Sequence, residues 1–114
     1  KDLSIDSWEH LIINTNKSKA FQLIMYAYLY LKQNTDQTSS VVGNISFKNL
    51  KEGLLCIKNK NTNKALVVGK DELQLFEEQL QNLLLDILDV QKPFIQTTKL
   101  STCDWCDFKS LCGR

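Results

Sequence analysis

One segment of the chain is hydrophobic on nearly every side of a predicted helix. Residues 17–33 contain no Gly or Pro, and between Ala20 and Leu31 only Gln22 is plainly polar. This pattern predicts a helix that is buried on most of its sides, with Ser18 available as its N-cap. The helix is too short to cross a bilayer, which requires about 20 apolar residues. We therefore expect it to lie in a protein core.

Short β-rich runs follow a polar loop over residues 34–40. Residues 41–47 and 54–58 predict an antiparallel strand pair, joined by a turn that ends at Gly53. A third run, residues 64–68, predicts another short strand. The middle of the chain is therefore expected to form a small antiparallel β-sheet.

Two amphipathic segments predict further helices on either side of this region. Trp8–Ile13 predicts a helix of few turns before the buried one. A longer helix is expected to begin at Asp71 as its N-cap and to end before Pro93. Its apolar side carries Leu73, Phe76, Leu80, Leu83, Leu84, Ile87 and Leu88. The expected fold class is α+β, with helices packed on a small antiparallel β-sheet and a C-terminal cysteine arm.

Size and composition favour one domain without a strong charge of either sign. The 114 residues are 43% hydrophobic and 24% charged, with a net charge of +1. We expect a single domain fragment over residues 1–114, with a helix–hairpin–helix part at 17–92 and a cysteine arm at 93–114. No global basic field indicates nucleic acid, so such a partner has to be argued from a site. Because the first residue is Lys1, we expect the chain to be a piece of a longer protein.

Three of the four cysteines are concentrated at the C-terminal end. Cys103, Cys106 and Cys112 have the spacing C-x2-C-x5-C, which brings two and then three thiolates toward one metal centre. Cys56 lies far upstream in a strand-like run and is expected to be a small buried hydrophobic residue. This clustering differs from the distributed cysteines of a secreted disulfide module and indicates a reducing, cytoplasmic compartment. Three ligands are one fewer than a tetrahedral zinc site or an iron–sulfur cubane requires.

A polar pair interrupts the buried helix. Gln22 and Tyr26 are four residues apart and therefore share one stripe of the helix. Their amide and hydroxyl groups suit a phosphate, a base edge or an active-site carboxylate. By residue type alone, a Gln at the edge of a core with Tyr packed beneath it is the favoured explanation, because a buried amide without partners costs about 1–3 kcal/mol.

The two motifs together resemble the C-terminal part of RecB-type nucleases in the PD-(D/E)XK superfamily, which include AddB-like helicase–nuclease subunits and CRISPR-associated adaptation exonucleases. The order is Gln22-x3-Tyr26, hairpin, long helix and the C-x2-C-x5-C tail. The resemblance implies that Gln22 and Tyr26 flank the active site or contact DNA. It implies that Cys103, Cys106 and Cys112 are ligands of a 4Fe-4S cluster in the intact parent protein, whose fourth ligand precedes the catalytic strands. It also implies an Mg²⁺-dependent DNA exonuclease acting in recombination or repair, with DNA and a helicase or helicase domain as partners, and without a membrane partner.

The chain departs from the family pattern at the catalytic carboxylates. The family requires an Asp, then an acidic residue two positions before a Lys, on adjacent strands, to hold Mg²⁺. Asp6 and Glu9 precede Gln22, but no E-x-K or D-x-K lies on a strand-like run there. We expect the catalytic strands to precede Lys1. The chain alone is then expected to be inactive and to hold no cofactor, with its tail anchored by Trp105, Phe108 and Leu111.

Two alternatives remain open at this stage. In the first alternative, the chain is a non-catalytic DNA-binding or scaffold module. In the second, it is a small zinc-dependent interaction domain. His10, the sole histidine, is expected to have a surface or helix-end role. The lysines of the hairpin region are expected to be a solvated edge that discourages strand pairing. These are Lys48, Lys51, Lys58, Lys60, Lys64 and Lys70.

Overall fold

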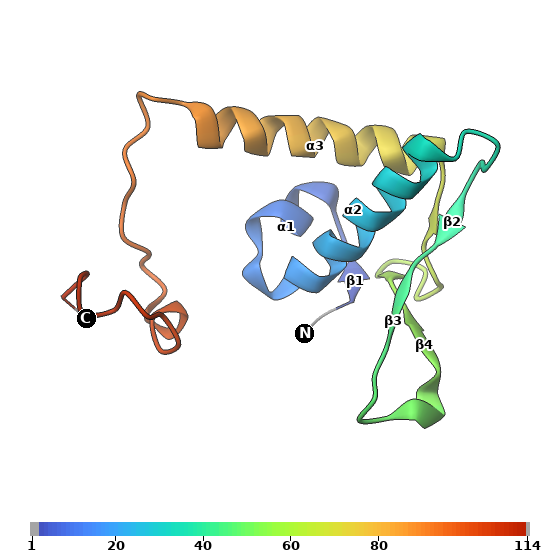
Figure 1. The fold of residues 1–114 in the computed structure, drawn as a ribbon, viewed down its shortest axis with the longest axis horizontal. Coiled ribbons are helices and arrows are strands. Elements are labelled where there is room, and N and C mark those ends of the chain that lie inside the picture. Colours follow the sequence, from blue (N-terminus) through green and yellow to red (C-terminus); the bar gives the residue numbers. More distant parts are fainter. Residues whose placement is uncertain (1–2, 114) are drawn as a thin grey trace.

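The computed structural model describes residues 3–113 and shows helices packed beside a small β region, with an extended C-terminal arm (Figure 1). This arrangement confirms the expected α+β class. None of the helices within these residues has both the length and the apolar character needed to cross a membrane. The elements are β1 (Ser4–Ile5), α1 (Trp8–Ile13), α2 (Ser18–Gln33), β2 (Ser40–Val41), β3 (Gly43–Ile45), β4 (Leu54–Cys56), β5 (Lys58–Asn59), β6 (Val67–Val68) and α3 (Lys70–Leu88), with 3-10 turns at Thr15–Lys17, Leu50–Glu52 and Leu100–Thr102.

The β region contains the expected antiparallel pairs and one parallel pair. β3 and β4 form a hairpin in which Gly43 faces Cys56, and β2 pairs antiparallel with β6. The Ile57 amide donates to the Val42 carbonyl, which links the two antiparallel pairs through the chain after β4. β1 pairs in parallel with β5. The sequence did not predict β1, because two residues are too few to show a strand's alternation.

The core forms where α1, α2 and the first half of α3 meet. The Phe76 ring of α3 is fully buried, with its centroid 5.6 Å from that of Phe21, 5.8 Å from Tyr28 and 6.4 Å from Trp8. These distances and the tilted rings are the favoured geometry for aromatic packing. The other buried hydrophobic residues are Ile5, Leu11, Ala20, Ile24, Ala27, Leu31, Ile57, Leu66 and Val68.

Both expected N-caps are wrong. Ser18 is already inside α2, whose N-cap is Lys17, and no side chain caps this end. The preceding 3-10 turn, Thr15–Lys17, leads directly into the helix and moves its start. Asp71 lies within the first turn of α3, whose N-cap is Gly69. The Gly69 amide donates to the Glu72 carboxylate at 3.0 Å, so an acidic side chain one turn later satisfies the helix start.

The predicted burial of three apolar segments is also wrong. α2 buries one stripe, whereas Tyr26, Leu29 and Tyr30 are exposed, because no described element covers that side. On α3 only Phe76 of the predicted apolar side is fully buried; Leu84, Ile87 and Leu88 are exposed because the helix continues beyond its partners, as Figure 1 shows. The tail residues Trp105, Phe108 and Leu111 do not anchor the arm, since Trp105 is 95% exposed and the other two are also exposed.

Candidate functional site

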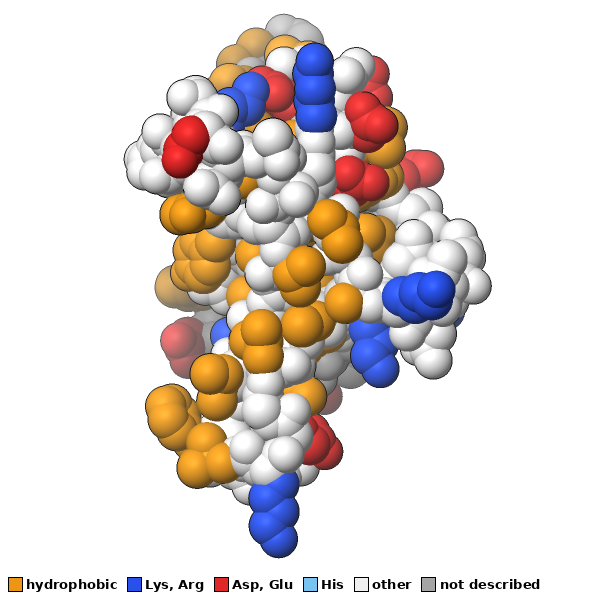
Figure 2. All heavy atoms as spheres, turned by 90° about the vertical axis from the view of Figure 1, so that its right-hand side faces the viewer, with side chains coloured by type: hydrophobic (Ala, Val, Ile, Leu, Met, Phe, Trp, Pro, Cys, Tyr) orange, Lys and Arg blue, Asp and Glu red, His pale blue; other side chains and the backbone are white. Residues whose placement is uncertain are grey.

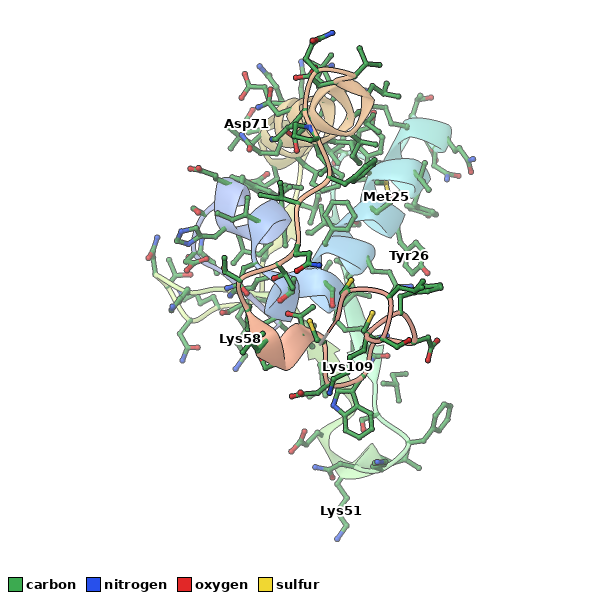
Figure 3. The ribbon with its side chains drawn as sticks, turned by 90° about the vertical axis from the view of Figure 1, so that its left-hand side faces the viewer. Met25, Tyr26, Lys51, Lys58, Asp71 and Lys109 are labelled. Atoms are coloured by element: carbon green, nitrogen blue, oxygen red, sulfur yellow. The ribbon has the colours of Figure 1, made fainter. Side chains whose placement is uncertain are left out.

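The predicted Gln–Tyr pair lies on the exposed side of α2. The Gln22 Nε2 donates to the Tyr26 hydroxyl at 2.7 Å, and the Tyr26 side chain is 55% exposed. Lys19 and Leu23 complete the same stripe, because residues three and four apart are neighbours on a helix. In Figure 3, Tyr26 projects from the side of α2. The polar pair is therefore a surface feature, and its amide is not enclosed in the core.

A groove of about 710 Å³ runs between this stripe and the β3–β4 hairpin. The hairpin wall consists of Asn44, Ser46 and Lys48, with Leu55 beside them. Leu3, next to β1, completes the lining. The register explains part of this wall, because Asn44 is paired with Leu55 and paired residues share a face of the hairpin, while Ser46 and Lys48 follow the end of β3. Helix and hairpin thus present polar side chains to one shared space.

The groove is electropositive and rich in hydrogen-bonding groups. Lys19 lies on the helical wall and Lys48 on the hairpin wall, and no carboxylate is among the described lining residues. Gln22, Tyr26, Asn44 and Ser46 add amides and hydroxyls that donate and accept. A negatively charged, hydrogen-bonding ligand matches this surface.

The sequence alone indicates the helical wall of the groove but not the hairpin wall. The alternation of polar and hydrophobic residues through Asn44, Ile45 and Ser46 already contained a usable signal. Period-two spacing places Asn44 and Ser46 on one face and Ile45 on the other, whereas Phe47 and Lys48 lie in the turn after β3. What the alternation does not indicate is which face turns toward α2. The six lysines that were predicted to form one solvated edge therefore do not share one role, because Lys48 lines this groove and the other five do not.

Comparison with protein-family profiles matches residues 7–113 to the PD-(D/E)XK nuclease superfamily. The chain belongs to this superfamily. The matched segment includes both the Gln22–Tyr26 stripe and the three tail cysteines, so the predicted relationship is confirmed at the level of the superfamily. No curated protein and no solved structure matches the chain in the corresponding comparisons.

Asp6 and Glu9, the described acidic residues before α2, do not converge with a third metal-ligating side chain. Asp6 lies among basic side chains, with His10 Nδ1 3.3 Å and Lys60 Nζ 3.6 Å from its Oδ2, and Lys17 Nζ 4.0 Å from its Oδ1. The hydrogen bond with His10 holds the pKa of the Asp6 carboxyl at about 2, below the ordinary 3.8. The D-x-K triplet that begins at Asp107 lies in a turn of the arm and not on a strand.

The cysteine tail of this superfamily member consists of successive turns. The Cys106 amide donates to the Cys103 carbonyl, and the Cys112 amide donates to the Lys109 carbonyl, both at 3.2 Å. None of the four cysteines forms a disulfide, and Cys56 is half-buried in β4 instead of fully buried as expected. Within residues 3–113, no three His, Cys, Asp or Glu side chains converge as metal ligands. In this arrangement the thiols of Cys103, Cys106 and Cys112 are therefore not gathered around one position.

An ion-pair cluster fixes α2 against α3 on the far side of the helix from the groove stripe. The Tyr28 hydroxyl donates to Glu77 Oε1 at 3.2 Å, and Lys32 Nζ donates to Glu77 Oε2 at 3.1 Å. Lys32 and then Tyr28 lower the pKa of Glu77, whereas burial and then Glu77 raise the pKa of Tyr28. These contacts hold the orientation of α2, and with it the direction in which Gln22 and Tyr26 point.

Proposed function

We propose that this chain is the C-terminal part of a metal-dependent DNA exonuclease of RecB/AddB type that acts in recombination or repair. The observation that carries the proposal is the superfamily match over residues 7–113, which includes the hydrogen-bonded Gln22–Tyr26 pair at an electropositive groove. In this proposal, DNA is the substrate, and a helicase or helicase domain supplies the unwound ends. Gln22 and Tyr26 flank the active site or contact the DNA.

The catalytic carboxylates and their Mg²⁺ belong, in this proposal, to strands that precede Lys1. The position of the first described residues supports this arrangement. Ser4–Ile5 already pairs in parallel with β5, and Leu3 lines the groove. A preceding segment would therefore enter the molecule at the β region and beside Gln22.

The cysteine arm is proposed to hold a 4Fe-4S cluster in the longer protein. Cys103, Cys106 and Cys112 would supply three thiolates, and a cysteine upstream of the catalytic strands would supply the fourth. The C-x2-C-x5-C spacing supports this proposal, because such spacings gather thiolates around clusters. The same concentration of cysteines favours a reducing, cytoplasmic compartment.

The test compares two glutamines of the same helix in the longer protein, prepared with the sequence that precedes Lys1. With Mg²⁺ and end-labelled DNA, we expect progressive degradation from the ends. Gln22→Ala should reduce the rate by about tenfold or more, the loss expected when a charge-assisted contact of about 1.5–3 kcal/mol is removed. Gln33→Ala, at the exposed C-terminal end of α2, is the matched control and should leave the rate unchanged. The 114-residue chain alone should leave the DNA intact.

Other results would contradict the proposal. A longer protein that binds DNA but degrades none of it with Mg²⁺ or Mn²⁺ would indicate a non-catalytic binding or scaffold module. Metal-dependent degradation by the 114-residue chain, abolished by Gln22→Ala, would show that the carboxylates lie within this chain after all.

A further inference from the structure

We infer that the groove between α2 and the β3–β4 hairpin binds one single strand of DNA, with the hairpin as a specific wall of the site. The inference rests on the proposed nuclease function and adds to it the form of the substrate and the residues Asn44, Ser46 and Lys48. These three residues belong to neither sequence motif, and the tertiary structure places them opposite Gln22 and Tyr26.

Charge complementarity favours a phosphate backbone along this groove. Lys19 and Lys48 stand on opposite walls, so a strand that lies between them contacts a cation on each side. No carboxylate among the described lining residues opposes them. The amide of Asn44 and the hydroxyl of Ser46 donate hydrogen bonds of the kind that position phosphate and sugar groups. Together these groups match a chain of phosphates better than an uncharged ligand.

The Tyr26 ring favours a single strand over a duplex. Its hydroxyl is tied to Gln22 Nε2 at 2.7 Å, while 55% of the side chain remains accessible at the groove. A held aromatic ring beside a basic groove is the usual platform for stacking an unpaired base. In a duplex the faces of the bases are covered by their neighbours, so this ring has no base to stack on.

The opposite face of the same hairpin is hydrophobic, and residues outside the groove offer positions for control substitutions. It carries the exposed hydrophobic residues Ile45, Phe47 and Leu54, and Figure 2 shows hydrophobic side chains gathered along this side of the molecule. Phe47 is 89% exposed but does not line the groove. Figure 3 shows Lys51 at the far end of the hairpin, also outside the groove. Substitutions at Phe47 and Lys51 therefore alter the same hairpin without altering the inferred site.

The first experiment measures binding of a labelled oligothymidylate of about 16 nucleotides, the upper end of the usual site size, by fluorescence anisotropy without divalent metal. We expect the 114-residue chain to prefer this strand to a blunt duplex. Lys48→Gln should reduce the slope of log affinity against log salt concentration by about 0.7, the value for one phosphate contact on a single strand. Lys51→Gln, the matched control, should leave the slope unchanged.

The second experiment tests stacking with a base-free ligand. Tyr26→Ala should weaken binding of the oligothymidylate roughly five- to hundredfold, the range for loss of one stacked base. The same substitution should have little effect on an abasic strand of equal length, which offers no base to the ring. Tyr30→Ala removes a similarly exposed tyrosine from the same helix, outside the groove, and should change neither affinity.

Several results would overturn the inference. These are a preference for the duplex, an equal reduction of the salt slope by Lys48→Gln and Lys51→Gln, or an effect of Tyr26→Ala that persists on the abasic strand.

Other results would point to a different surface or separate the two proposals. If Phe47→Ala alone abolishes binding or dissociates a dimer seen by light scattering, the hydrophobic face, and not the groove, is the interaction surface. If the groove variants behave as expected but the longer protein never cleaves DNA, the groove stands and the nuclease proposal fails. If the longer protein cleaves DNA but its binding does not change in Lys48→Gln and Tyr26→Ala, the nuclease proposal stands and the groove inference fails.

Discussion

At the scale of single residues, Asp6 connects three parts of the fold. Its carboxylate lies within 4.0 Å of His10 on α1, Lys60 after β5 and Lys17 before α2. Lys17 is itself buried, and its Nζ donates to the Ser4 carbonyl at 2.6 Å. The carboxylate therefore helps to compensate a buried positive charge beside β1.

This network predicts a stability that depends on pH in the acid range. The pKa of Asp6 is about 2 in the folded protein against 3.8 ordinarily, so its contribution is fully present above about 3.8 and is lost as the pH falls through about 2. Urea unfolding at successive pH values should show this loss, and Asp6→Asn should flatten it. Asp104→Asn, on the exposed arm, should leave the profile unchanged; an equal flattening there would contradict the role of Asp6.

At the scale of elements, the hairpin wall depends on close approach of two strands. Gly43 faces Cys56 in the β3–β4 pair, and a Cβ added at Gly43 would lie 2.7 Å from the Leu55 carbonyl oxygen. Backbone atoms at that distance have to move, since no flexible side chain is there to yield. The absence of a side chain at Gly43 thus determines the position of Asn44 and Lys48 relative to α2.

We expect Gly43→Ala to destabilise the protein by about 1–3 kcal/mol, the usual cost of overpacking. The measurement is the midpoint of urea unfolding, and single-strand binding at the groove should weaken together with it. Asn44→Ala, on the adjacent exposed position, is the matched control for stability and should stay within about 0.5 kcal/mol of the parent chain. A fully stable Gly43→Ala variant would show that the strands can separate without cost.

At the scale of the whole molecule, the helices and β region form one packed body, and the arm lies apart from it (Figure 1). The core centres on Phe76, whereas the last turn of α3, residues 84–88, and the aromatic residues of the arm are exposed. Within the arm, Gln96 Nε2 donates to the Cys112 carbonyl at 3.1 Å and closes a loop around the cysteines. The arm is therefore locally organised without being packed on the core.

This separation leads to a prediction about the cysteines. Metal affinity requires all ligand positions to be filled by deprotonated ligands, so the 114-residue chain should purify with the tail free of metal. The longer protein, prepared without oxygen, should contain iron and show visible absorbance. Cys106→Ser should remove both signals, whereas Cys56→Ser, half-buried in β4, should retain them. Stoichiometric zinc in the 114-residue chain would favour the interaction-domain alternative, and absence of metal from both proteins would contradict the cluster.

The sequence by itself determined the order and type of the main elements. Helical periodicity placed α1 and α3, an apolar run without Gly or Pro placed α2, and β-branched runs placed the β3–β4 hairpin. These patterns reflect local geometry that persists in the folded protein. It also determined the Gln22–Tyr26 pair, since a spacing of four residues on a helix brings two side chains together without help from the rest of the chain. The resemblance to the superfamily followed from this pair together with the hairpin, the long helix and the spacing of Cys103, Cys106 and Cys112.

Only the tertiary structure decided which surfaces meet and which stay open. The apolar sequence of α2 does not indicate how many sides of the helix are covered by other elements. Tyr26, Leu29 and Tyr30 are exposed although neighbouring residues of the helix are buried. Alternation in β3 does not indicate which face turns to the helix, so only packing placed Asn44 at the groove, together with Lys48 from the turn after β3. Two-residue strands depend on contacts distant in sequence, as the pairing of β1 with β5 shows. The groove exists because side chains from distant segments converge, and local periodicity contains no information about that convergence.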